Sequence, residues 1–204
     1  LFDGQPKDAD KLQIALRGRV DLPADDGDQG ALELTADQLA QEVGAVGNNL
    51  IVEKDTILEN LQKVQDRNGL ELASGLVDDS LDFDVEMETG TGKTYVYLRT
   101  IFELAQKYNF TKFIIQVPSV AIREGVNTSI KLMKEHFRDL YPALPFDSSV
   151  YSGASAEEVQ AFATSTNIQI LIMTIDSVRG NANSRIIHQT RDKLQGLRPI
   201  DYLK

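Results

Sequence analysis

The sequence predicts an α/β fold in which helices cover both faces of a parallel sheet. From residue 81 onwards, apolar strand-like runs alternate with helix-like runs. A glycine-rich segment stands where the first of these strands meets the first of these helices. Parallel strands need long crossover connections, and the intervening helices supply them.

Composition suits one sizeable domain, or one domain with an appendage. The chain has 204 residues, 42% of them hydrophobic, which is enough for a packed core. It contains no cysteine, which excludes disulfides and thiolate metal sites and fits a reducing cytoplasm. The apolar runs are too short to cross a bilayer, and the N-terminus lacks a signal-peptide layout. We therefore expect a cytoplasmic protein with no membrane partner.

Charge is distributed unevenly along the chain. Residues 1–92 hold 7 Lys and Arg against 21 Asp and Glu, a balance of −14. Residues 93–204 hold 14 against 10, a balance of +4. The overall charge of −10 therefore does not exclude a nucleic-acid partner for the second half.

We expect an acidic segment of helices and loops over residues 1–80, ahead of an α/β part over residues 81–204. A capping-box pattern at Thr35 opens a short helix in the first segment. A second helix is predicted over residues 55–68, where apolar side chains recur on one face.

The elements of the α/β part follow in order. Alternation of apolar and acidic residues predicts a strand over residues 81–87. Helical spacing predicts helices over residues 93–108 and from Ser119 to Leu140, and Pro118 ends a strand between them at residues 113–117. Further along we expect a strand at residues 148–151 and a helix that a capping box opens from residue 155. An apolar strand at residues 168–175 and a last helix at residues 184–194 follow. The long helix is expected to bury Ile122, Val126, Ile130, Met133, Phe137 and Leu140.

The junction between the first strand and the first helix has the composition of a phosphate-binding loop. Its residues are Glu88, Thr89, Gly90, Thr91, Gly92, Lys93 and Thr94. Glycines let the backbone aim its N–H groups at an anion, and the following helix presents its positive end. Lys93 and Thr94 are the candidate catalytic residues, because the lysine can reach the β- and γ-phosphates of ATP and the hydroxyl can ligate Mg²⁺. The general pattern puts a first glycine where Met87 stands, and the alternative is a glycine-rich turn with a surface lysine.

The stretch from Leu81 to Val126 also resembles a known family. The phrases EMETGTGKTYVYLRTIFEL and TKFIIQVPSVAIREGV are similar to the first motor lobe of superfamily 2 helicases. Within that group they most resemble the Res subunit of Type III restriction enzymes, which has a second valine where Gln116 stands here. The resemblance runs from about Asp82 to Lys204.

This resemblance implies a RecA-like P-loop NTPase lobe, incomplete in this chain, that uses ATP and Mg²⁺ on duplex DNA. It also implies DNA cleavage by a distant nuclease domain and site recognition by a Mod methyltransferase subunit. Pro118, Ser119 and Arg123 would contact a DNA phosphate, with Thr174 and Ser177 on the same face. The alternative role for Ser119 is a plain helix cap, and for Thr174 and Ser177 it is structural.

One departure from the family concerns an Asp-Glu pair, which holds Mg²⁺ through water and orients the attacking water. No such pair occurs in the sequence. The resemblance places it just beyond Lys204, and Asp176 is the nearest candidate within the chain. His136 and His188 have no catalytic partner nearby in sequence, so we expect surface or packing roles for both.

Two other functions fit the same residues. One is a stand-alone superfamily 2 helicase or translocase, which would differ in the sequence that follows the motor. The other is a non-catalytic nucleotide-binding module in which Asp176 serves Mg²⁺.

Overall fold

The computed structural model describes residues 1–7, 48, 50–152, 157–179, 185–189 and 198–203. These residues fall into two compact units, one made of residues 1–7 and 50–93 and the other of residue 48 and the described residues from 94 onwards. The helix predicted from Thr35 lies outside the described residues. No described helix is long and apolar enough to span a membrane.

The first unit is built around α3 (Lys54–Arg67), which confirms the helix predicted there. Asn60 is buried on this helix, and its amide donates to the backbone carbonyls of Leu1 and Asp3, both at 3.0 Å. These bonds tie the beginning of the chain to the helix. A short 3-10 turn, η1 (Val77–Asp79), follows later in the unit.

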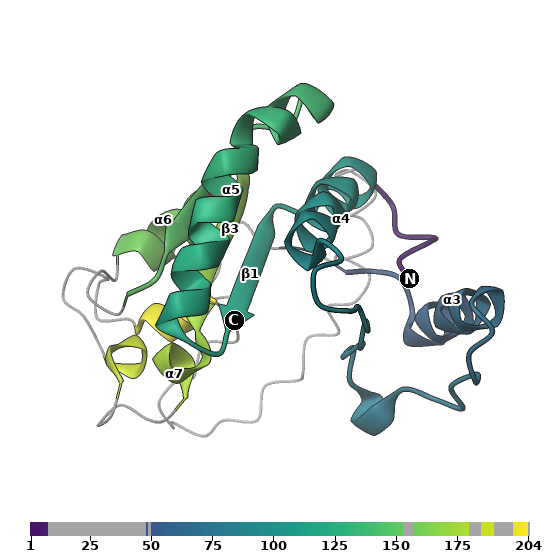
Figure 1. Ribbon diagram of the computed structural model, residues 1–204. Helices are drawn as coiled ribbons and strands as arrows, with labels where there is room; N and C mark the ends of the chain where they lie inside the picture. The colour runs from purple at the N-terminus through teal and green to yellow at the C-terminus, as the bar shows by residue number, and fades with distance from the viewer. Residues whose placement is uncertain (8–47, 49, 153–156, 180–184, 190–197, 204) are drawn as a thin grey trace, which may run out of the picture. The chain divides into compact units, whose positions relative to one another are not determined.

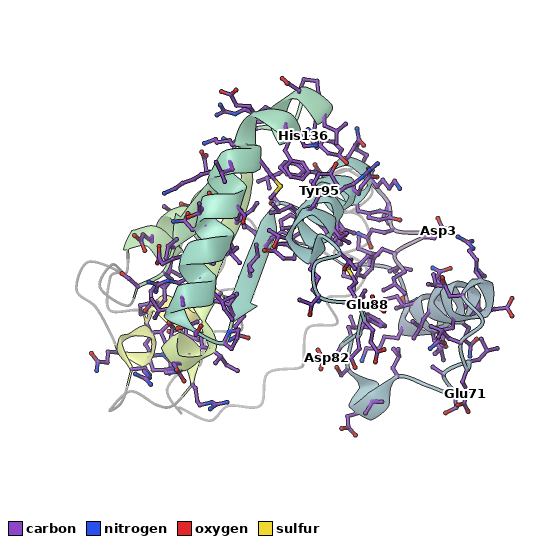
Figure 2. All side chains as sticks on the ribbon, viewed as in Figure 1. Asp3, Glu71, Asp82, Glu88, Tyr95 and His136 are labelled. Atoms are coloured by element: carbon purple, nitrogen blue, oxygen red, sulfur yellow. The ribbon has the colours of Figure 1, made fainter. Side chains whose placement is uncertain are left out.

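The strand predicted over residues 81–87 is not formed. This segment has no regular secondary structure and pairs with none of the strands described, and Figure 2 labels Asp82 on it. Alternation of apolar and polar side chains indicates a strand with two different faces. It does not provide a neighbouring strand to pair with the backbone N–H and C=O groups. The apolar face is also unpacked in part, because Val85 is 81% exposed.

The second unit contains three parallel strands, β1 (Lys112–Val117), β2 (Phe146–Val150) and β3 (Ile168–Thr174). Their order in the sheet is β1-β3-β2, so the last strand lies in the middle. Every residue of β3 is buried, which agrees with the burial that its apolar sequence predicted.

Helices cover both faces of this sheet, as predicted. Figure 1 shows α4 (Lys93–Tyr108) and α5 (Val120–Leu140) beside the strands. On one face of the sheet, buried side chains of these two helices form one cluster with Ile170 of β3. On the other face, α6 (Glu157–Thr164) packs with Leu171 of β3 in a second cluster. Successive side chains of a strand point to opposite faces, so β3 supplies both clusters.

The predicted burial along α5 is wrong at its two ends. Ile122 is 48% exposed and Leu140 is 44% exposed, whereas Val126, Ile130 and Phe137 are buried. Eighteen residues of an α-helix complete about five whole turns, so Ile122 and Leu140 share one angular position. That position lies at the border of the buried stripe rather than at its centre.

The last part of the chain differs most from expectation. A short helix, α7 (Ile175–Val178), directly follows β3 and was not predicted. Of the helix expected over residues 184–194, the structure describes residues 185–189, which form the 3-10 turn η2 (Ile186–His188). A further 3-10 turn, η4 (Pro199–Tyr202), lies near the end of the chain.

Candidate functional site

The glycine-rich segment forms a tight turn held by its own hydrogen bonds. Gly90 and Gly92 take the left-handed conformation, with φ of +82° and +83°. The Thr91 hydroxyl donates to the carbonyl of Glu88 at 2.7 Å, and the Thr91 amide points at the same oxygen at 3.4 Å. The backbone around both glycines is open, since a Cβ on either would meet no atom within 4 Å. An anion could therefore approach the loop closely.

Lys93 closes the turn and begins the helix. Its ammonium is exposed and donates to the carbonyl of Glu88 at 2.9 Å. It is also the first residue of α4, a helix of 16 residues with no acidic residue in its first turn. The first N–H groups of a helix have no partner within it and carry a partial positive charge. The start of α4 thus combines an ammonium with unpaired backbone N–H groups, and its first turn carries no carboxylate.

Thr94 and Tyr97 lie one turn apart at the start of α4. Thr94 is partly buried and makes no hydrogen bond through its hydroxyl among the described residues. The Tyr97 hydroxyl oxygen is buried and likewise has no hydrogen-bond partner of normal geometry in the part described. Burial raises the pKa of Tyr97, and the nearby Thr94 side chain partly opposes that rise. Sequence reasoning missed Tyr97, although a hydroxyl one turn after the phosphate-loop threonine was a visible signal.

The second group of predicted residues gathers at one edge of the sheet. Val117 of β1 pairs with Thr174 of β3, so the two parallel strands end side by side. Pro118 and Ser119 follow the first strand, and Ser177 lies on α7 after the second. The structure therefore brings these residues to the carboxyl ends of neighbouring strands, as expected.

Ser119 acts as the cap of α5. Its hydroxyl accepts from the amide of Ile122 at 3.3 Å, which is the helix-cap role considered above. A hydroxyl oxygen has two lone pairs and one proton, so the cap leaves the O–H free to donate.

Arg123 is engaged within the protein. Its side chain is 13% exposed, and it donates to the carbonyl of Tyr151 at 3.3 Å. It also pairs with Glu124 at 2.9 Å. These contacts tie α5 to the end of β2 and leave little of the guanidinium for an outside phosphate.

Thr174 and Ser177 bond to each other. Their hydroxyl oxygens are 2.8 Å apart, and Thr174 is 6% exposed. This geometry gives both residues a structural role at the junction of β3 and α7. Asp176 lies between them in sequence, exposed in the first turn of α7.

Both histidines have packing partners. Figure 2 shows His136 close to Tyr95, whose hydroxyl lies 3.1 Å from the His136 ring nitrogen Nε2. His188 lies with its Nε2 2.8 Å from the carbonyl of Val178. Across the described residues, no group of three or more His, Cys, Asp and Glu could hold a metal ion.

Comparison with known proteins points to one family. The family described as "Type III restriction enzyme, res subunit" matches residues 53–197. Among curated relatives, the Res subunit of the Type III restriction-modification enzyme EcoPI from Escherichia phage P1 is 46% identical over 86 residues, which are 41% of this chain and 9% of the relative. The StyLTI Res subunit of Salmonella typhimurium (strain LT2) is 50% identical over 66 residues, 31% of this chain and 7% of the relative. The EcoP15I Res subunit of Escherichia coli is 53% identical over 60 residues, 28% of this chain and 6% of the relative. The matched part of this chain thus spans less than a tenth of each relative.

Proposed function

This chain belongs to the family of Type III restriction enzyme Res subunits, and we propose that it forms the ATP-binding part of the motor of such a subunit. Its open parallel sheet is part of a RecA-like lobe. In the full enzyme, ATP hydrolysis would drive action on duplex DNA and lead to cleavage. A Mod methyltransferase subunit would be the partner that recognises the site, and the cytoplasm would be the compartment.

The observation that carries this proposal is the loop that leads into α4. Two left-handed glycines precede a helix whose first residue is Lys93. Backbone amides, a helix N-terminus and an ammonium together suit a polyphosphate, whose several charged oxygens each need such a partner. In this structure Lys93 is held by the Glu88 carbonyl, a contact that phosphate oxygens would replace.

The residues also fit a magnesium–nucleotide complex. The Thr94 hydroxyl oxygen accepts no hydrogen bond among the described residues, so its lone pairs are available to a metal ion. Thr94 would hold Mg²⁺, while the loop from Glu88 to Lys93 would hold the phosphates. Bound Mg²⁺ would neutralise charge on the β- and γ-phosphates. The chain itself binds and orients the nucleotide, and the water-orienting acid would come from outside residues 1–204.

For DNA, the carboxyl edge of the sheet is the proposed surface. Ser119, whose O–H donates to no group among the described residues, and the adjacent Pro118 are the residues that the geometry supports best. Arg123 contributes by holding α5 to β2. Thr174 and Ser177 shape the neighbouring strand end through their mutual hydrogen bond.

A nucleotide titration tests the ATP site. In the full-length protein, Lys93→Ala should weaken binding of a fluorescent ATP analogue at least tenfold and remove ATP-dependent DNA cleavage, because a charged phosphate contact is lost. Lys107→Ala is the matched control, since that lysine lies in the last turn of the same helix and pairs with Glu103 at 3.3 Å. Unchanged affinity in Lys93→Ala would refute the assigned role, whereas a loss confined to Lys93→Ala supports it.

A further inference from the structure

The Tyr97 hydroxyl is a buried polar group without a hydrogen bond in the part of the chain described. Its ring packs against the cluster that α4 and α5 form on the sheet, so the side chain is held in place. Most buried hydroxyls in proteins have a partner, and an exception calls for an explanation. The polar side chain one turn earlier on the same face of α4 is Thr94.

Thr94 lacks a hydrogen bond that three other helical hydroxyls of the described residues make. Thr100, Ser129 and Thr164 each donate to the carbonyl four residues earlier, at 2.9 Å, 2.9 Å and 3.0 Å. Thr94 is the second residue of α4, so the carbonyl four residues before it belongs to the loop rather than to the helix. Its proton therefore lacks the usual acceptor, one turn from a phenol oxygen that also lacks a partner.

We propose that Tyr97 is a positioning residue that accepts the Thr94 O–H proton and so turns the Thr94 oxygen lone pairs toward the bound magnesium–nucleotide. A hydroxyl that ligates a metal through oxygen keeps its proton and must donate it elsewhere. Groups that hold a metal ligand in this way commonly change metal affinity when removed. The inference rests on the proposed ATP site, because it assigns Thr94 its magnesium role.

The test is the substitution Tyr97→Phe in the full-length protein, which keeps the packed ring and removes only the oxygen. A fluorescent ATP analogue is titrated at equilibrium with Mg²⁺ and with a chelator. We expect the gain in affinity produced by Mg²⁺ to fall about tenfold, while the affinity without Mg²⁺ stays unchanged. Tyr95→Phe is the matched control, because that hydroxyl contacts His136 at 3.1 Å instead, and its magnesium gain should equal that of the unchanged protein.

A double substitution separates positioning from general damage. Thr94→Ala alone should remove the gain in nucleotide affinity that Mg²⁺ produces. Adding Tyr97→Phe should then cause no further loss, because both substitutions act through the Thr94 hydroxyl. A Tyr97→Phe protein with the full gain would overturn the inference. So would an equal loss of affinity with and without Mg²⁺, or a further loss in the Thr94→Ala background.

The outcome for the ATP site itself can be told apart. If Lys93→Ala and Thr94→Ala weaken binding but Tyr97→Phe does not, only the role of Tyr97 fails. If the unchanged protein binds no nucleotide, or if Lys93→Ala binds it normally, the proposed function fails and the role of Tyr97 fails with it.

Discussion

Gly90 and Gly92 adopt nearly the same left-handed backbone conformation, at φ of +82° and +83°, on either side of Thr91. Neither glycine is crowded, because a Cβ placed on either would meet nothing within 4 Å. The requirement for glycine at these positions is therefore conformational. It fixes the shape of the loop that leads into α4.

We expect Gly90→Ala and Gly92→Ala to impair nucleotide binding by changing this shape. A left-handed alanine costs about 1–2 kcal/mol, so the loop should relax to another conformation and lose its set of amides. Gly69→Ala is the matched control, since Gly69 has φ of +65° and equally open surroundings but follows α3. Nucleotide titration should show weaker binding for the two loop variants only. Equal binding by all three variants would contradict the loop's role.

Substitutions of Ser119 can separate its cap from a DNA contact. Ser119→Ala should lower the free energy of unfolding by about 1 kcal/mol, because the Ile122 amide loses its acceptor. Ser119→Asp retains a capping oxygen and should preserve stability, yet its charge should repel a DNA phosphate. Thermal unfolding and a duplex-DNA binding titration measure the two effects. If Ser119→Asp binds duplex DNA with normal affinity, Ser119 has only the helix-cap role and makes no DNA contact.

The bond between Tyr141 and Glu103 should make stability depend on pH. The Tyr141 hydroxyl donates to the Glu103 carboxylate at 2.7 Å, and this bond, together with Lys107, lowers the pKa of Glu103. A carboxyl whose pKa is lower in the folded chain contributes stability above its unfolded pKa and loses it as pH falls through the folded pKa.

We expect Tyr141→Phe to lower the free energy of unfolding by about 1 kcal/mol at neutral pH, a value reduced for solvent exposure of the carboxylate. The difference from the unchanged protein should shrink in acid, where Glu103 is protonated. Denaturant unfolding at several pH values measures it. In a Glu103→Gln background this pH dependence should vanish, and its persistence there would assign it to other groups.

The aromatic packing between α4 and α5 should dominate the stability of the second unit. Phe137 is 2% exposed, and its ring stacks on Phe102 with centroids 4.8 Å apart. Phe137→Ala should cost about 3–5 kcal/mol, because it removes buried apolar surface and leaves a cavity. Leu132→Ala on the same helix is the control, with an expected change within about 0.5 kcal/mol, since Leu132 is 80% exposed. Similar midpoints for the two variants in thermal unfolding would refute this ranking.

Substitution of Asp176 tests the competing nucleotide-binding module. Asp176 is exposed in the first turn of α7, a four-residue helix after β3. If the motor function is right, Asp176→Asn should leave the affinity for a magnesium–nucleotide complex unchanged, because the acidic pair that serves Mg²⁺ lies elsewhere. A loss of magnesium-dependent affinity in Asp176→Asn would favour the module.

The isolated chain should hydrolyse ATP negligibly. It lacks an Asp-Glu pair in its 204 residues, and without such a pair the attacking water is not oriented. Phosphate release by the purified chain, compared with its Lys93→Ala variant, is the measurement. Sustained turnover that Lys93→Ala abolishes would show that another residue orients the water.

The sequence by itself determined the local features of this protein. Glycine spacing predicted the turn before α4, helical spacing predicted α3, α4 and α5, and the apolar run predicted the buried strand β3. Each of these features depends on residues close together in the chain. There the conformational freedom of glycine and the spacing of apolar side chains determine the local structure.

The tertiary structure decided what depends on distant partners. Residues 81–87 have the pattern of a strand but form none, because a strand exists only through the neighbour that takes its hydrogen bonds. Arg123 donates a hydrogen bond to the carbonyl of Tyr151, 28 residues later in the sequence, and no local sequence pattern predicts that contact. The buried oxygen of Tyr97 likewise follows from packing against the core, which one-dimensional spacing does not specify.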